Sequence, residues 1–167
     1  MTKSQSADVK ALARGRAHGP SWATSVTSRR AMQANRRRDT QPELALRSEL
    51  FRLGLRYRVD ARPIRTVRCT ADLVFPRARV AVFVDGCFWH RCPRHGEQPV
   101  ANADYWSEKI GSNVERDRMV DATLGAAGWT VVRVWEHEDM ADAACRLAVI
   151  LHQGGPNPLR LGETDGV

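Results

Sequence analysis

The chain has 167 residues, which is enough for one compact domain with a hydrophobic core and too few for two. Its net charge of +7 and pI near 9.9 indicate a polyanionic partner, and the short apolar runs favour nucleic acid over a membrane. The first 30 residues lack the apolar stretch of a secretory signal, so we expect a cytoplasmic protein whose cysteines bind metal rather than form disulfides.

Three segments are expected along the chain. Residues 1–30 are basic and aperiodic and predict a disordered arm, residues 31–153 predict the folded domain, and residues 154–167 predict a loose tail. The arginine run Arg36, Arg37 and Arg38 lies where the arm meets the domain. Because basic side chains release counterions from DNA, we expect this run to contact phosphates. A solvated tail without function is the alternative for the first 25 residues.

A helix is predicted from Thr40 to about Leu53. Thr40 suits the N-cap position, Pro42 is tolerated in the first turn, and Gly54 follows the last apolar residue. Glu43 stands at the third helical position and has two interpretations. It is either a capping-box glutamate that accepts a hydrogen bond from the Thr40 amide or a functional carboxylate.

Two β runs, 71–75 and 80–84, surround a turn that contains proline and predict a hairpin. A loop of even length places Asp72 opposite Phe83, and Asp85 then lies one diagonal step away on the same face. Two neighbouring carboxylates are commonly bridged by a divalent cation, so the pair indicates a metal site that could act on phosphate. Two solvated aspartates at strand ends are the alternative.

Four further elements complete the predicted domain. They are a strand near 56–59, a helix over 103–127, a strand over 129–136 and a helix over 141–152. The long helix has an apolar stripe and a basic surface, and the basic residues include Lys109 and Arg116. We expect both to contact DNA.

Cysteine and histidine residues follow the hairpin at metal-ligand spacing. Cys87, Cys92 and His95 form a C-x4-C-x2-H pattern that leaves a tetrahedral zinc one ligand short. His137, directly after a predicted strand, would supply the fourth ligand of a closed, structural site. Buried free cysteines with incidental histidines are the alternative.

The same loop contains an unassigned histidine and two adjacent aromatics. His90 lies five residues after Asp85 and suits proton transfer at neutral pH, with a zinc ligand or a surface imidazole as alternatives. Phe88 and Trp89 would point in different directions, so at least one is expected to be exposed for stacking on or wedging between bases. Core packing is the alternative for one of them.

The runs Gly86 to His90, Tyr105 to Ile110 and Asn113 to Arg118, with Asp72 on a strand, resemble the very short patch repair (Vsr-like) DNA mismatch endonucleases. The resemblance covers residues 32–138 in the family's order. It implies a variant of the restriction-endonuclease-like PD-(D/E)xK fold, an α/β fold with a mixed central sheet, flanking helices and a structural zinc. It also implies nicking of one strand of duplex DNA 5′ to the thymine of a T:G mismatch, the product of 5-methylcytosine deamination.

The resemblance also implies roles for individual residues. Asp72 matches a metal-binding aspartate, Glu43 a helix glutamate that acts through water at the metal, and His90 an active-site histidine. The residues that match DNA wedges are Phe88, Trp89 and, from the arm, Met32.

The zinc ligands resemble the family pattern with two changes. His95 is shifted by one residue, and His137 stands where the family has a cysteine. Because cysteine and histidine exchange freely in zinc sites, the predicted site is retained.

Asp85 departs from the best-studied family pattern, which has a second histidine at this position. The change brings the site closer to the general nuclease arrangement of two acidic metal ligands. We therefore expect Asp72, Asp85 and the Val84 carbonyl to hold Mg²⁺, which would activate a water and stabilise the leaving oxygen. His90 would assist proton transfer, and Lys109 would contact a phosphate near the cut.

Two other functions remain open from the sequence. One is a Vsr-like endonuclease with another target, such as modified or foreign DNA, and the other is a zinc-braced DNA-binding module without activity. We expect a monomer that works on double-stranded DNA in a bacterial nucleoid, makes no membrane contact, and has mismatch-repair proteins as candidate partners.

Overall fold

The computed structural model describes residues 38–96 and 102–154. Within these residues the chain forms one four-stranded sheet, in the order β1-β2-β3-β4, and three helices. The elements in chain order are α3 (Gln41–Arg52), β1 (Arg58–Ala61), β2 (Ala71–Phe75), β3 (Val80–Asp85), α4 (Ala103–Ala126), β4 (Thr130–Trp135) and α5 (Met140–Gly154). The mixed sheet with flanking helices confirms the predicted α/β class. The predicted DNA contacts Met32, Arg36 and Arg37 lie outside the described residues.

Strands β2 and β3 form the predicted hairpin. The turn between them is closed by a hydrogen bond from the Arg79 amide to the Pro76 carbonyl, and Arg79 adopts a positive φ of 53°. The pairing joins Leu73 to Val82, a register that continues to Asp72 opposite Phe83, as the sequence predicted. The hairpin therefore brings the first residues of β2 beside the last residues of β3.

Strand β4 pairs with β3 in parallel, so the chain must cross from one end of the sheet to the other between them. Helix α4 makes this crossover. The register sets Phe83 opposite Arg133 and Asp85 opposite Trp135. The carboxyl ends of β3 and β4 and the start of β2 consequently share one edge of the sheet.

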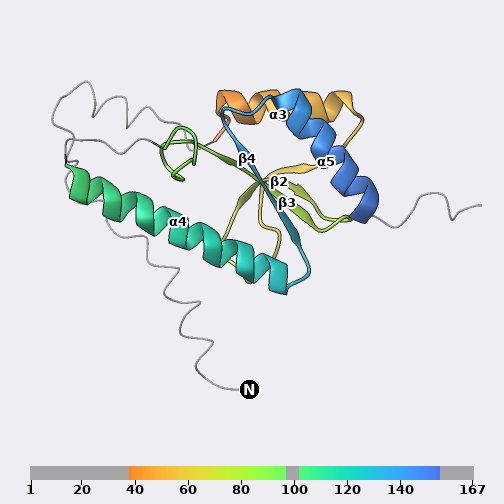
Figure 1. The fold of residues 1–167 in the computed structure, drawn as a ribbon. Helices are drawn as coiled ribbons and strands as arrows, with labels where there is room; N and C mark the ends of the chain where they lie inside the picture. Colours follow the sequence, from red (N-terminus) through yellow and green to blue (C-terminus); the bar gives the residue numbers. More distant parts are fainter. Residues whose placement is uncertain (1–37, 97–101, 155–167) are drawn as a thin grey trace, which may run out of the picture.

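Helices cover both faces of the sheet (Figure 1). Helices α3 and α5 pack together on one face, where Leu46, Leu50 and Leu147 are fully buried. Helix α4 covers the other face with Leu124. Each fully buried leucine contributes roughly 1.5–3 kcal/mol to the free energy of folding. The two apolar layers therefore stabilise the sheet, and with it the edge formed by the carboxyl ends of β3 and β4 and the start of β2.

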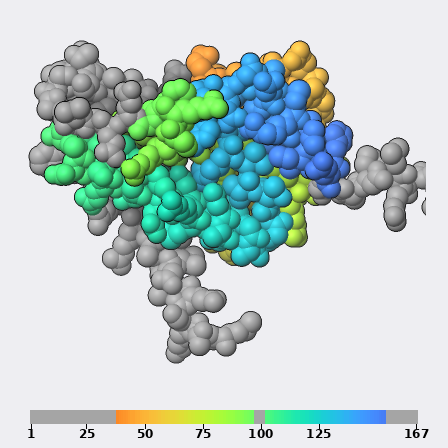
Figure 2. Space-filling model, viewed as in Figure 1, coloured from red at the N-terminus to blue at the C-terminus, as the bar shows by residue number. Residues whose placement is uncertain are grey.

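Helix α4 is longer than the sheet is wide. Its first half extends past the sheet beside the loop that follows β3 (Figure 1), and this loop stands at the molecular surface between α4 and the end of β4 (Figure 2). Only Ile110 and Leu124 of the 24 residues in α4 are buried. No helix in the described ranges combines the length and the hydrophobicity needed to cross a lipid bilayer.

The observed bounds differ from the predicted ones by one or two residues. Strand β1 begins at Arg58 rather than near residue 56, because Tyr57 donates a hydrogen bond to the Arg47 carbonyl of α3 at 2.8 Å and packs edge-on against Phe75. Helix α5 begins at Met140, where the Asp139 carboxylate accepts hydrogen bonds from the amides of the first turn. Tertiary contacts and a cap decide these bounds.

Candidate active site and metal centre

Three carboxylates predicted to act in catalysis come from different elements and approach the same edge of the sheet. Asp72 lies at the start of β2, Asp85 at the end of β3, and Glu43 in the first turn of α3. The negative charges of Glu43 and Asp85 both act on the carboxyl group of Asp72. The structure thus brings together residues that are 42 positions apart in the chain.

Asp72 is a half-buried carboxylate with few compensating groups. Its Oδ2 accepts a hydrogen bond of 2.7 Å from the Val84 amide, which places the Val84 peptide directly beside it. Burial, reinforced by the charges of Glu43 and Asp85, raises the pKa of Asp72 to about 6, although the Val84 hydrogen bond and Arg47 oppose the shift. A bound cation would favour the ionised form, so this side chain suits the predicted magnesium site.

Asp85 has a cationic partner that the sequence analysis missed. It is 3% exposed, and both of its carboxylate oxygens accept hydrogen bonds from Nη1 of Arg133, at 3.0 and 2.8 Å. Arg133 lies on β4 opposite Phe83, one diagonal step from Asp85. The signal in the sequence was an arginine inside the apolar run of β4, where an unpaired charge would be unfavourable.

His90 lies against two acids. Its Nδ1 is 2.5 Å from Oδ2 of Asp117, on α4, and 3.6 Å from Oδ1 of Asp85. Burial alone would lower the pKa of His90, but the hydrogen bond to Asp117 and the charge of Asp85 outweigh it and raise the pKa. The imidazole is thus held at the carboxylate site with its protonated form stabilised. Asp117 lies in one of the recognised sequence runs, although it received no role there.

Glu43 caps the start of α3 in a modified form of the predicted capping box. It accepts hydrogen bonds from the Asp39 amide at 3.0 Å and the Thr40 hydroxyl at 2.9 Å, whereas the prediction had named the Thr40 amide as the donor. The Thr40 side chain itself caps no backbone amide. Arg47 also donates to Glu43, at 3.0 Å. Glu43 is therefore fixed by the helix terminus while its charge reaches Asp72.

The four predicted zinc ligands converge. One donor atom from each of Cys87, Cys92, His95 and His137 lies within 4.8 Å of the other three. The Nδ1 atom of His137 is 3.0 Å from Sγ of Cys87 and 3.7 Å from Sγ of Cys92. In a tetrahedral site, zinc bond lengths separate a sulfur and a nitrogen ligand by about 3.5 Å. The donor set and its spacing fit a closed zinc site.

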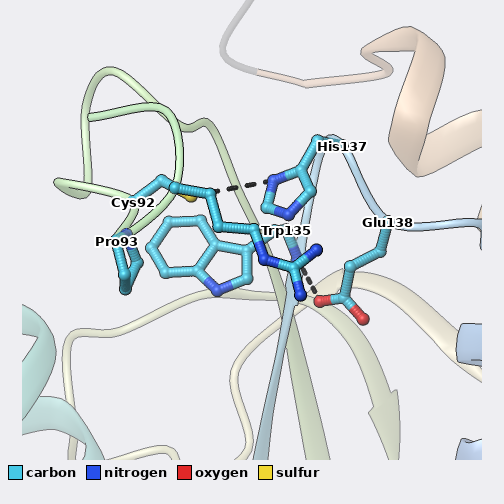
Figure 3. A pocket seen from close by; sticks show the side chains of 6 residues that line it. Cys92, Pro93, Trp135, His137 and Glu138 are labelled. Atoms are coloured by element: carbon cyan, nitrogen blue, oxygen red, sulfur yellow. Dashed lines mark hydrogen bonds between the residues drawn. The ribbon is translucent and has the colours of Figure 1, made fainter. Parts of the chain in front are cut away.

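Neighbouring groups hold the cluster in place. Figure 3 shows Cys92 and His137 directed toward each other beside Trp135, in a pocket that these residues line with Pro93 and Glu138. The backbone closes tightly here, since a Cβ atom on Gly96 would lie 2.5 Å from the Cys92 carbonyl oxygen. Glycine is therefore required for this loop to close around the cluster.

The two thiols of the cluster differ in acidity. Burial and the neighbouring Cys92 and Glu136 raise the pKa of Cys87 to about 11. Burial acts in the same direction on Cys92, but hydrogen bonds from the backbone amides of Arg94 and His95 prevail and lower its pKa. Zinc binding would require both thiols to ionise and would supply the positive charge that the cluster lacks.

Phe88 and Trp89 belong to an aromatic cluster at the surface beside the carboxylates. Both rings pack edge-on against Trp106 of α4, with centroids 5.3 and 6.0 Å away, and both remain half-buried. The Asn113 side-chain amide donates a hydrogen bond of 3.1 Å to the Trp89 carbonyl oxygen. Both rings therefore pack, as one alternative predicted, and part of each ring stays at the surface. Contact with DNA bases stays a prediction. Trp106 was expected only in the apolar stripe of the long helix, and its sequence position gave no sign of this cluster.

The predicted basic DNA contacts that lie in the described ranges are at the surface. Arg116 is exposed and Lys109 half-buried on α4, and Arg116 donates to Asn113. Arg38 is exposed and forms an ion pair with Asp60 at 3.2 Å. The helix residues thus lie on the element that also carries Trp106 and Asp117.

Comparisons with known proteins agree with this arrangement. A family model described as "DNA mismatch endonuclease Vsr" matches residues 23–95. The Type II nicking enzyme V.NaeI of Lentzea aerocolonigenes is 52% identical over 86% of this chain and 89% of its own length. The Type II nicking enzyme V.XorIIP of Xanthomonas oryzae pv. oryzae is 43% identical over 72% of this chain and 88% of its own. The DNA mismatch endonuclease Vsr of Escherichia coli K12 is 39% identical over 66% and 70%, respectively.

Proposed function

The chain belongs to the Vsr family of DNA mismatch endonucleases, and we propose on that basis that it nicks one strand of duplex DNA 5′ to the thymine of a T:G mismatch. The observation that carries the proposal is the continuity of the aromatic cluster with the carboxylate site. Phe88 and Trp89 directly precede His90, which contacts Asp85 and Asp117. A base step opened by the aromatics would therefore lie next to the phosphate to be cut.

A mismatch suits this arrangement energetically. Unstacking a base step costs a few kcal/mol, and stacking on an aromatic side chain returns about 1–3 kcal/mol per base. A mispaired step is easier to open than a matched one, so the same aromatics open it at a smaller net cost. Half-buried rings that already pack on Trp106 lose little further side-chain freedom when a base stacks on them.

The residues that would hold Mg²⁺ are Asp72 and the Val84 carbonyl, with Asp85 adjacent. When bound, the ion supplies Lewis-acid stabilisation of charge on the phosphate. Asp72 meets the requirement for a cation because its half-buried carboxylate lies near the like charges of Glu43 and Asp85. His90, oriented by Asp117, would hold the proton that the leaving 3′ oxygen needs.

Zinc at Cys87, Cys92, His95 and His137 would be structural. Four protein ligands leave no open coordination position for a substrate. The ion would join the loop after β3 to the end of β4, and this loop carries the aromatics and His90. Zinc therefore positions the DNA-contacting residues and takes no part in the chemistry.

A second candidate is nicking of a different DNA target. The observation that favours it is Asp85 in its ion pair with Arg133, at a position where the resemblance implied a histidine. The non-enzymatic interpretation is disfavoured because the chain belongs to an endonuclease family and several relatives are named nicking enzymes.

One assay tests the proposal. The purified full chain is supplied with Mg²⁺ and given a T:G duplex and its matched T:A twin, with Asp72→Asn as the control variant. We expect a nick 5′ to the thymine in the T:G duplex alone and none from the variant. Equal cutting of both duplexes would favour the second candidate, and full activity of Asp72→Asn would show that the active site lies elsewhere.

A further inference from the structure

We propose that the ion pair with Arg133 prevents Asp85 from binding the catalytic cation, so that Asp72 is the aspartate that binds Mg²⁺. Arg133 also positions Asp117 for its contact with His90. The inference rests on the magnesium site of the proposed function and names which of its two carboxylates is available. It does not depend on the choice of mismatch.

Arg133 is bound by three acids at once. Its Nη1 donates to both oxygens of Asp85, its Nε donates to Oδ2 of Asp121 at 3.0 Å, and its Nη2 donates to Oδ1 of Asp121 at 2.9 Å. Nη2 also lies 3.4 Å from the Asp117 carbonyl oxygen and 3.6 Å from its Oδ1. The guanidinium lies over the Phe83 ring, 5.0 Å from the centroid. Every guanidinium nitrogen is engaged, and the planar group has one orientation.

The charge of this arginine is secure. Arginine stays protonated in proteins, and its hydrogen bonds to Asp121 and Asp85 further stabilise the cation. Arginine therefore serves Asp85 as a permanent counter-ion. A divalent cation at Asp85 would have to displace these hydrogen bonds and approach a positive charge closely.

Asp72 contrasts with Asp85 in this respect. The backbone amide of Val84 occupies Oδ2 of Asp72, and no ion pair joins Asp72 to a basic side chain within residues 38–96 and 102–154. Of the two aspartates, Asp72 is therefore the one that gains most from a metal ion.

The same arginine links Asp85 to the histidine. Asp117 contacts Arg133 through its carbonyl and Oδ1 and contacts His90 through Oδ2. Removing the guanidinium would leave Asp85, Asp117 and Asp121 close together without their shared cation. We therefore expect an Arg133 variant without charge to gain a cation site while it loses catalytic rate.

The test counts bound Mn²⁺, used alone as a substitute for Mg²⁺, by the electron paramagnetic resonance signal of the free ion in zinc-loaded protein without DNA. The variants are Asp72→Asn, Asp85→Asn, Arg133→Gln, Arg133→Lys and the double variant Arg133→Gln with Asp85→Asn. Arg77→Gln is the matched control, since Arg77 is exposed in the β2–β3 turn at the opposite end of the sheet and its loss changes the net charge equally.

We expect Asp72→Asn to abolish Mn²⁺ binding and Asp85→Asn to leave it unchanged. Arg133→Gln should bind Mn²⁺ about tenfold more tightly, or bind an additional ion, and the double variant should lose that gain. Arg133→Lys should keep the affinity of the unchanged protein, because its charge remains. Its turnover should fall, because lysine has a single nitrogen and lacks the Nη2 atom that contacts Asp117.

A purely structural role for Arg133 would not raise metal affinity. The proposal is overturned if Asp85→Asn weakens Mn²⁺ binding as much as Asp72→Asn does, if Arg133→Gln gains no affinity over Arg77→Gln, or if neither the unchanged protein nor Arg133→Gln binds Mn²⁺. The comparison of Asp72→Asn with Asp85→Asn decides the matter even if Arg133→Gln does not fold. Nicking of T:G and T:A duplexes by the unchanged protein separately decides the proposed function.

Discussion

The zinc-ligand cluster and the carboxylate cluster lie at the same edge of the sheet but handle charge in opposite ways. In the zinc-ligand cluster, one donor atom from each of Cys87, Cys92, His95 and His137 lies within 4.8 Å of the others. These side chains form hydrogen bonds with one another and not with a lysine or arginine side chain in the described residues. In the carboxylate cluster, Arg133 neutralises Asp85. If zinc binds, its positive charge would balance the ionised thiols of the first cluster, whereas the second cluster already contains a cationic side chain.

This difference agrees with the two proposed roles, a structural site for zinc and a catalytic site for Mg²⁺. A closed set of four protein ligands binds its ion permanently. A carboxylate site in which a guanidinium occupies one of the two aspartates offers few protein ligands. A metal ion there would keep coordination positions for substrate and water. Each of the predictions below alters one of the two clusters.

The largest effect is expected from Cys87→Ala. Removing one of four ligands should abolish stoichiometric zinc and lower the melting temperature by roughly 10 °C or more, with loss of nicking, because the loop that carries His90 loses its anchor. Metal analysis and calorimetry measure these changes. Cys145→Ala is the matched control, since Cys145 is an exposed thiol outside the cluster. Full zinc content in Cys87→Ala would contradict the zinc assignment.

Asp72→Asn should reduce the nicking rate by roughly a hundredfold or more while zinc content stays unchanged. The amide keeps the shape of the side chain but lacks the charge that would hold the catalytic cation, and metal catalysis contributes several kcal/mol. Single-turnover nicking at saturating Mg²⁺ measures the effect. A smaller loss that higher Mg²⁺ concentration restores would place the main ligand elsewhere.

The same variant should be more stable than the unchanged protein when Mg²⁺ is absent. Because the pKa of Asp72 is raised from 3.8 to about 6, its ionised form destabilises the fold above about pH 6, and this penalty disappears as the pH falls toward 3.8. Asp72→Asn should therefore gain about 2–3 kcal/mol in unfolding free energy at pH 8 and almost nothing near pH 4. Urea unfolding at the two pH values measures it. An equal gain at both would show that titration of Asp72 is not the cause.

The smallest effect is expected at His90. Asp117→Asn removes the negative partner that raises the pKa of His90, so this pKa should fall. Since a raised histidine pKa stabilises the fold below the pKa of the unfolded chain and ceases to do so above the folded one, the variant should lose stability mainly at acidic and neutral pH. Nuclear magnetic resonance titration of the His90 ring measures the pKa. Asp142→Asn, at the start of α5, is the control, and an unchanged His90 pKa in Asp117→Asn would contradict the assignment.

The sequence predicts whatever depends on local pattern. The hairpin register followed from two β runs around a proline turn of even length, and it correctly placed Asp72 opposite Phe83. The zinc-ligand cluster followed from the spacing of Cys87, Cys92 and His95, and the fourth ligand from a histidine at the end of a predicted strand. For the hairpin and the first three ligands, the chain geometry within about ten residues decides the outcome. The position of His137 depends in addition on the pairing of β4 with β3.

The ion pairs of the carboxylate cluster could not be predicted in this way. Arg133 meets Asp85 because β4 pairs in parallel with β3 after a 24-residue helix, and Asp117 meets His90 because α4 packs against the loop after β3. Such contacts depend on how distant elements dock, which periodicity does not specify. The sequence predicted a cation between Asp72 and Asp85 because two negative charges lie close together there. It did not indicate that Arg133, between α4 and the sheet, already pairs with Asp85.

Strand β4 has a further consequence for folding. It carries Arg133 to one cluster and leads directly to His137 in the other. Its apolar alternation would be satisfied equally by a pairing with β3 displaced by two residues, which preserves the face of every side chain. Such a slip would move Arg133 and His137 by about 7 Å, leaving Asp85 unpaired and the zinc ligands separated. The carboxylate cluster and the zinc-ligand cluster thus destabilise a displaced pairing of β4 that the hydrophobic core alone would not distinguish from the observed one.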